Sequence, residues 1–104
     1  MRLSMESQVA IPQSFVDLFV PRGRSKPGIA REQIAARHEA CEDLAQALVE
    51  PASTALSQHG VTEQDVMDRV LAGLLSGEAG LGREEAMWVA RRLAELLEWS
   101  DVWL

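Results

Sequence analysis

Apolar residues recur at intervals of three and four along most of this 104-residue chain, and this spacing constrains the fold more than any other feature. The spacing places apolar side chains on one side of an α-helix, whereas a half-buried strand would alternate apolar and polar residues. No sustained alternation is present, and aromatic residues, which favour strands, make up only 5% of the chain. The sequence therefore predicts an all-α fold.

The first half of the chain contains a short and a long helical pattern. The short one runs from Pro12 to Phe19, because proline suits a first helical turn, and Pro21 ends it. The long one runs from about Ile29 to His59. Pro51 interrupts it, since proline lacks a backbone donor and clashes with the carbonyl four residues earlier. We expect either one kinked helix or two helices that meet near Glu50.

A signal that ends one helix and starts another follows the long pattern. Gly60 suits the left-handed conformation that closes a helix. Thr62 suits an N-cap, and Asp65, three residues later, is placed to return a hydrogen bond as in a capping box. Val61 and Val66 have the spacing of a hydrophobic staple. A third helix is therefore predicted to begin here.

The stretch GEAGLGRE has nearly the glycine spacing of a phosphate-binding loop, G-x-x-x-x-G-K-[ST], at Gly77 and Gly82. Arg83 replaces the lysine, and Glu84 replaces the hydroxyl residue that would hold Mg²⁺. A carboxylate at that position would also repel phosphate, and the preceding segment has helical rather than strand spacing. We interpret the stretch as a turn between a helix that ends near Ser76 and a last helix that starts near Arg83. No cofactor is expected.

Together these patterns predict a small bundle of about four helices that forms one domain over residues 1–104. Residues 1–10 are expected to be flexible. Residues 21–28, PRGRSKPG, are basic and rich in proline and glycine, so we expect an extended linker or arm.

Charge is spread unevenly along the chain. Residues 1–31 carry five basic and two acidic groups, a net charge of +3, whereas residues 32–104 carry five basic and 14 acidic groups, a net charge of −9. The acidic body argues against nucleic acid as a partner, because neutralising phosphate supplies most non-specific affinity. The basic residues Arg22, Arg24 and Lys26 are compatible with a solvated linker, with docking on an acidic protein or a second copy, or with contact to nucleic acid.

The sequence offers one set of possible metal ligands. His38, Cys41 and Glu42 share a helix face, but a zinc site needs three or four ligands, and His59 lies far along the pattern. A reactive thiol would also need an electropositive setting, whereas acidic residues surround this cysteine. We therefore expect a buried apolar Cys41, a partly buried His38 with a local partner, and neither a metal site nor catalytic residues.

Three tryptophans lie close together near the end of the sequence. Trp88 lies off the apolar stripe of the last helix, and Trp99 and Trp103 follow it. Together with Val102 and Leu104 they are candidates for an exposed interaction patch, since tryptophan is enriched in interface hot spots. The alternative is that they lock the last helix onto the first short one. The sequence leaves both possibilities open.

The cysteine count and the hydropathy pattern indicate a compartment. A single cysteine excludes an internal disulfide and suits a reducing cytoplasm. No apolar run reaches the roughly 18 residues that a membrane span needs. We expect a cytoplasmic protein without membrane contact.

The segment IPQSFVDLFVPRGR, followed downstream by WVARRLAELLEW, resembles a family of small, uncharacterised proteobacterial proteins that are sometimes labelled as ATPases with chaperone activity. The resemblance implies a bacterial cytoplasmic setting. The label also implies nucleotide hydrolysis, but the residues needed for it are missing here, so no catalytic residue is carried over.

These observations predict a non-enzymatic protein-interaction module, adaptor or chaperone-like, that self-associates as a homodimer through the C-terminal aromatic cluster. The alternative is a small nucleic-acid-associated regulator that uses residues 22–26.

Overall fold

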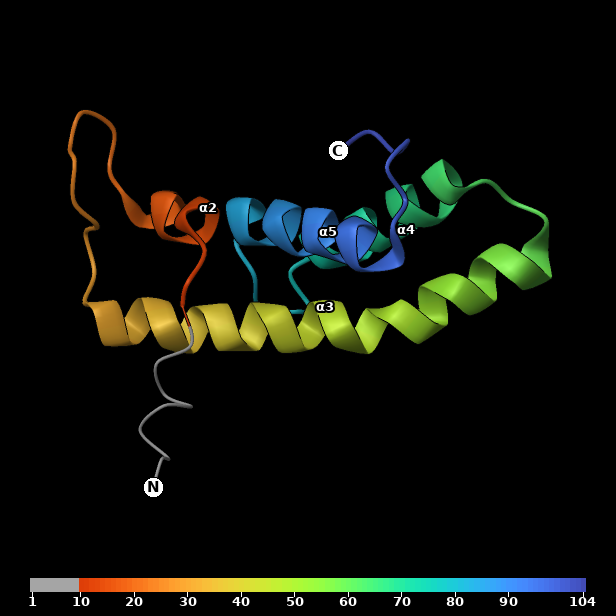
Figure 1. Cartoon of the computed structure of the whole chain (residues 1–104), viewed down its shortest axis with the longest axis horizontal. Coiled ribbons are helices and arrows are strands. Elements are labelled where there is room, and N and C mark those ends of the chain that lie inside the picture. The colour runs from red at the N-terminus through yellow and green to blue at the C-terminus, as the bar shows by residue number, and fades with distance from the viewer. Residues whose placement is uncertain (1–9) are drawn as a thin grey trace, which may run out of the picture. The chain divides into compact units, whose positions relative to one another are not determined.

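Helices account for all the regular secondary structure in residues 10–104, the part of the chain that this computed structural model describes (Figure 1). The all-α prediction is confirmed, whereas the predicted flexibility of residues 1–10 falls almost wholly on residues outside the described part. In chain order the elements are α2 (Gln13–Val16), the 3₁₀ helix η1 (Asp17–Phe19), α3 (Arg31–His59), α4 (Glu63–Leu75) and α5 (Arg83–Leu97).

The chain forms two units, Met1–His38 and Glu39–Leu104, with the boundary inside α3. Their formal charges have opposite signs. The first unit carries six basic and three acidic groups, a net charge of +3, and the second carries four basic and 13 acidic groups, a net charge of −9.

In the first unit, α2 starts where proline was expected to start it. Pro12 is the N-cap residue, and its carbonyl accepts hydrogen bonds from Phe15 N at 2.9 Å and from Val16 N at 3.1 Å. The Phe15 ring is fully buried and lies 5.4 Å from the Phe19 ring and 5.3 Å, edge to face, from the His38 ring. His38 is thus half-buried beside a local aromatic partner, as predicted.

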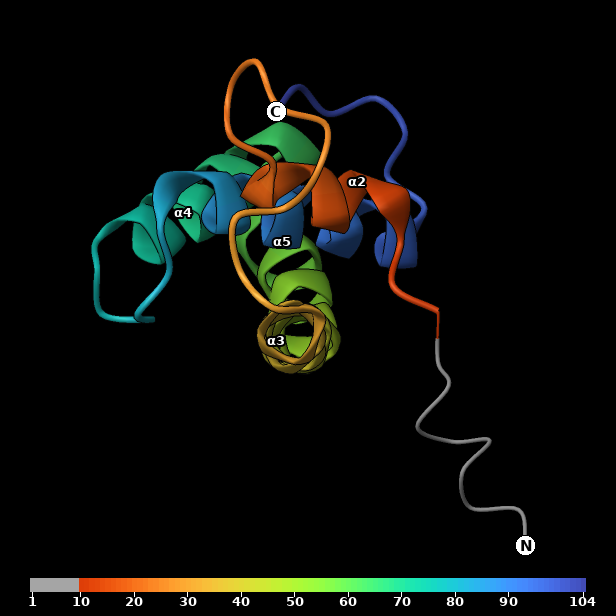
Figure 2. The ribbon, with the colours of Figure 1, turned by 90° about the vertical axis from the view of Figure 1, so that its left-hand side faces the viewer.

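The basic segment 21–28 is a closed loop rather than the extended arm that its composition suggested (Figure 2). Gly28 N, at the end of the segment, donates to Phe19 O, just before the segment, at 2.8 Å, and Arg24 N donates to Pro21 O at 3.0 Å inside it. The bond from Arg24 closes a local turn in which Gly23 has φ 80°, a conformation that favours glycine, whereas the bond from Gly28 to Phe19 has no local signal in the sequence.

Helix α3 is continuous through Pro51 and spans 29 residues. The alternative of two helices that meet near Glu50 is therefore wrong, and the kinked helix is correct, since Figure 1 shows α3 bending in its C-terminal part. The bend follows from the missing proline donor and from the clash of its ring with the preceding turn.

Helix α4 begins with the predicted capping box. Asp65 N donates to the Thr62 hydroxyl oxygen at 3.0 Å, and Thr62 N donates to the Asp65 carboxylate at 3.1 Å. Gly60, just after α3, has the predicted left-handed conformation at φ 61°. The staple between Val61 and Val66 stays a prediction, although Val66 is buried.

The GEAGLGRE stretch connects α4 to α5, which pack against each other. Gly77 and Gly80 have φ values of 94° and 73°, so they provide the left-handed conformations that the turn requires. Gly82 has an ordinary φ of −75° and is the N-cap residue of α5. The predicted turn between helices is confirmed. Helix α5 contributes the most buried side chains of any element: Ala86, Trp88, Val89, Ala90, Leu93 and Ala94.

Candidate interaction site at the C-terminal tail

The C-terminal tail, which we define as residues 99–104, is turned back by an unusual residue at the end of α5. Glu98 is left-handed, with φ 60° and ψ 35°, and no other non-glycine residue in the described chain has a positive φ. Trp99 N then donates to Ala94 O at 2.9 Å, the six-to-one bond of a Schellman motif. The reversal directs the tail back along α5.

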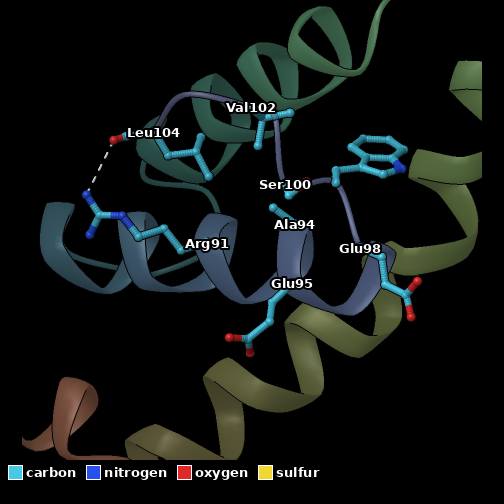
Figure 3. Close-up of a pocket in the computed structure, with 8 residues that line it drawn as sticks. Arg91, Ala94, Glu95, Glu98, Ser100, Val102 and Leu104 are labelled. Carbon is cyan, nitrogen blue, oxygen red and sulfur yellow. Dashed lines mark hydrogen bonds between the residues drawn. The ribbon is translucent and has the colours of Figure 1, made fainter.

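One glutamine side chain holds the backbone of the tail. The Gln64 amide nitrogen donates to Trp103 O at 3.0 Å, and Trp103 N donates to the Gln64 amide oxygen at 2.6 Å. The same amide nitrogen donates to the Asp68 carboxylate at 2.8 Å, which orients the amide. Leu104 follows Trp103, and its carbonyl oxygen accepts a longer hydrogen bond of 3.4 Å from the Arg91 guanidinium (Figure 3). The tail is therefore fixed through main-chain atoms.

The three tryptophans have different surroundings. Trp88 and Trp99 are each only 8% exposed, whereas Trp103 is 84% exposed. Val102 and Leu104 are half-buried. The predicted patch of three exposed tryptophans is thus reduced to Trp103 and its tail neighbours.

Trp88 and Trp99 are buried for different physical reasons. Trp88 looked peripheral because it lies off the apolar stripe, but the buried face of α5 is wider than that stripe and includes Trp88. Trp99 directly follows the left-handed residue, and an apolar side chain in that position commonly packs back on the last helical turns. The burial of Trp99 could have been predicted from the sequence, because an apolar residue just after the end of a helix is a signal for such packing.

A hollow of about 450 Å³ lies between the tail and α5. Figure 3 shows Arg91 reaching towards Leu104 along it, whereas the carboxylates of Glu95 and Glu98 point away from the tail. Its lining is mainly apolar, with residues from both segments: Arg91, Ala94, Glu95, Glu98, Trp99, Ser100, Val102 and Leu104. A hollow of this size and chemistry suits apolar groups better than reacting polar ones.

A partly buried ion pair joins α5 to α3 beside this site. Arg92 Nε donates to one Glu42 carboxylate oxygen at 2.9 Å, and Arg92 Nη2 donates to the other at 3.0 Å. Arg92 also pairs with Glu95 one turn later. The hydrogen bond to Glu42 is the main cause that raises the pKa of Arg92 above its ordinary value, so the guanidinium stays charged throughout the physiological range. This contact spans 50 residues of sequence, and sequence reasoning considered Glu42 as a metal ligand and as an acidic neighbour of Cys41, but not as a partner of Arg92.

The other predicted groups do not belong to the tail. Arg22, Arg24 and Lys26 are exposed on the closed loop of the first unit. Cys41 is fully buried, as expected. Within residues 10–104 no three His, Cys, Asp or Glu side chains are grouped so that they could hold a metal ion. In the same range, no helix combines the length and apolar character needed to cross a membrane.

Comparisons with family models, with curated proteins and with solved structures found no match to this chain.

Proposed function

We propose that the protein is a non-enzymatic, cytoplasmic protein-interaction module, adaptor or chaperone-like, that associates with a second copy of itself through the tail. One observation carries the proposal: Trp103 is 84% exposed while its own backbone makes two hydrogen bonds with the Gln64 side chain, one in each direction. A large apolar side chain is thus offered to solvent from a fixed position.

The physical benefit of such an arrangement is preorganisation. Burying a tryptophan side chain removes about 150–250 Å² from water, which contributes about 4 kcal/mol or more at the usual conversion. Ordering a mobile segment on binding would consume part of that free energy. Because Gln64 already fixes the Trp103 backbone, less ordering remains to be done. This supports a role for Trp103 as an interface anchor.

Sedimentation analysis of the full chain over a range of concentrations tests the proposal. Trp103→Ala should weaken self-association by at least about tenfold, because truncating a hot-spot residue typically costs about 2 kcal/mol or more. Leu75→Ala is the matched control, since Leu75 is another exposed apolar residue, 42% exposed, at the far end of α4. Equal association of the wild type and Trp103→Ala would refute the proposal.

The alternative function is a nucleic-acid-associated regulator that uses Arg22, Arg24 and Lys26. The closed loop supports it by gathering three exposed cations on one short segment. The net charge of −9 on the second unit opposes it. Salt-sensitive binding to single- or double-stranded nucleic acid that disappears when all three residues become alanine would favour this alternative.

A further inference from the structure

A second, smaller hollow lies where α3 bends. It measures about 120 Å³ and is lined by Leu48, Pro51, Ala52 and Ala55 of α3 and by Val66, Arg69 and Val70 of α4. The bend at the proline and the two small alanines leave room that a straight helix with larger residues would fill. Arg69 supplies the only charged group in the lining.

We infer that this hollow, hereafter the α3–α4 hollow, receives the Trp103 side chain of a second copy of the chain. The inference rests on the proposed function and names the docking site for it. At about 120 Å³ the hollow is smaller than the roughly 150 Å³ apolar cavity that encloses a benzene ring, so it can accept one edge of the indole while the rest of the ring packs over its rim. Chemistry fits too, because aliphatic groups can pack on the indole faces and the Arg69 guanidinium can lie over the ring in a cation–π contact.

The contact has to be made between two chains. Gln64 holds the Trp103 backbone, and Val66, which lines the hollow, lies two residues later on α4. Two residues correspond to about 200° around a helix, so the tail and the hollow occupy opposite faces of α4. The Trp103 side chain is accordingly exposed in its own chain rather than inserted.

Charge complementarity favours a second copy as the occupant. Asp101 is exposed on the tail two residues before Trp103, and Arg69 is exposed at the rim of the hollow. In the described part of the chain neither residue has an ion-pair partner. Insertion of Trp103 would bring Asp101 close to Arg69 of the second copy, so each chain supplies the charge that the other lacks.

The placement of the two features allows one copy to donate its tryptophan and another copy to receive it. Tail and hollow belong to the same unit, Glu39–Leu104, but lie on opposite faces of α4, so the contact joins different surfaces of the two copies. The net charge of −6 on each chain opposes the pairing. We therefore expect a reversible dimer.

A pair of complementary variants tests the inference by sedimentation. Trp103→Ala removes the inserted group, and Ala55→Leu fills the hollow while leaving Trp103 in place. Each variant alone should weaken self-association by about 30-fold, the effect of losing a hot-spot contact of about 2 kcal/mol. An equimolar mixture should form a heterodimer, because one variant still offers the hollow and the other still offers the tryptophan.

The outcomes separate this inference from the proposed function. If Ala55→Leu associates like the wild type while Trp103→Ala does not, the α3–α4 hollow is the wrong docking site and the proposed function stands. If neither variant changes association, both fail. Circular dichroism of each variant verifies that the helices are retained.

Charge reversal provides a second test that leaves the hollow volume unchanged. Arg69→Glu and Asp101→Arg should each weaken the dimer, since each places like charges opposite one another. The double variant should associate more tightly than either single variant, because the opposite charges are restored in exchanged positions. A double variant no tighter than its parents would overturn the inferred pairing.

Discussion

Glu98 ends α5 in a conformation that glycine adopts more easily. Its φ of 60° brings its Cβ close to its own carbonyl oxygen, a cost of roughly 1–2 kcal/mol for ordinary L-residues in this region. The residue nevertheless sets the direction of the tail and lines the larger hollow. A strained non-glycine residue at a candidate binding site is consistent with selection for position or charge rather than stability alone.

Substituting this residue should stabilise the chain. Glu98→Gly should raise the free energy of unfolding by about 0.5–1 kcal/mol, because the backbone strain is relieved. Urea denaturation measures this free energy. Gly60→Ala is the matched control, because it adds a Cβ at a left-handed residue where Glu98→Gly removes one. Gly60 has φ 61° with open space around it, so only strain is added, and stability should fall by about 1 kcal/mol. A loss of stability in Glu98→Gly would mean that the carboxylate makes a stabilising contact.

The Gln64 clamp makes a separate prediction about the tail. Gln64→Ala removes the acceptor for Trp103 N and should speed hydrogen exchange of that amide by at least about tenfold, the effect of losing two hydrogen bonds. Gln46→Ala is the control, since Gln46 makes an equivalent bond to a carboxylate four residues away, on α3. Unchanged exchange at Trp103 in Gln64→Ala would contradict the clamp.

At the scale of elements, the sequence specified what depends on local residues. The two ends of α4 and the start of α5 were predicted from Thr62, Gly77 and Arg83, because caps and glycine turns act over a few positions. Features that depend on packing against distant residues were left open by the sequence. The choice between a kinked helix and two helices at Pro51 could not be made, because neighbouring side chains decide whether a proline kink is tolerated.

The candidate site was less predictable than the helices. The sequence drew attention to tryptophans near the end of the chain, and Trp103 is the one that stays exposed. Its partner Gln64 lies 39 residues earlier, and nothing in the residue pattern connects the two. The sequence left the burial of Trp88 open, because the width of a buried helix face is set by how many neighbours surround the helix.

Pro51 gives the prediction that belongs to the element scale. Pro51→Ala should restore a backbone donor within α3 and raise the free energy of unfolding by about 1–3 kcal/mol. A straighter α3 should also narrow the α3–α4 hollow, so self-association should weaken while stability rises. Chemical denaturation and sedimentation of the same variant check the two effects. Tighter association in a more stable Pro51→Ala would argue that the bend does not form the docking site.

At the scale of the whole molecule, self-association has to overcome like charge. Each chain carries a net charge of −6, so raising ionic strength from low values should screen the overall repulsion. The same salt screens the proposed Asp101–Arg69 pairs only in part, because they would lie beside a buried ring. We therefore expect the dimer to tighten modestly with salt up to about physiological ionic strength. A steep loss of association over that range would indicate that ion pairs, and not the tryptophan, hold the dimer.

The central claim is that Trp103 is free in the single chain and covered in the dimer. Trp103 is 84% exposed, whereas Trp88 and Trp99 are each 8% exposed, so acrylamide quenching of tryptophan fluorescence reports mainly on Trp103. We predict that the quenchable fraction falls, and the emission shifts to the blue, as protein concentration passes through the dimerisation range. Trp103→Ala should show weak quenching at every concentration. Quenching of the wild type that stays constant while sedimentation records dimer formation would contradict the claim.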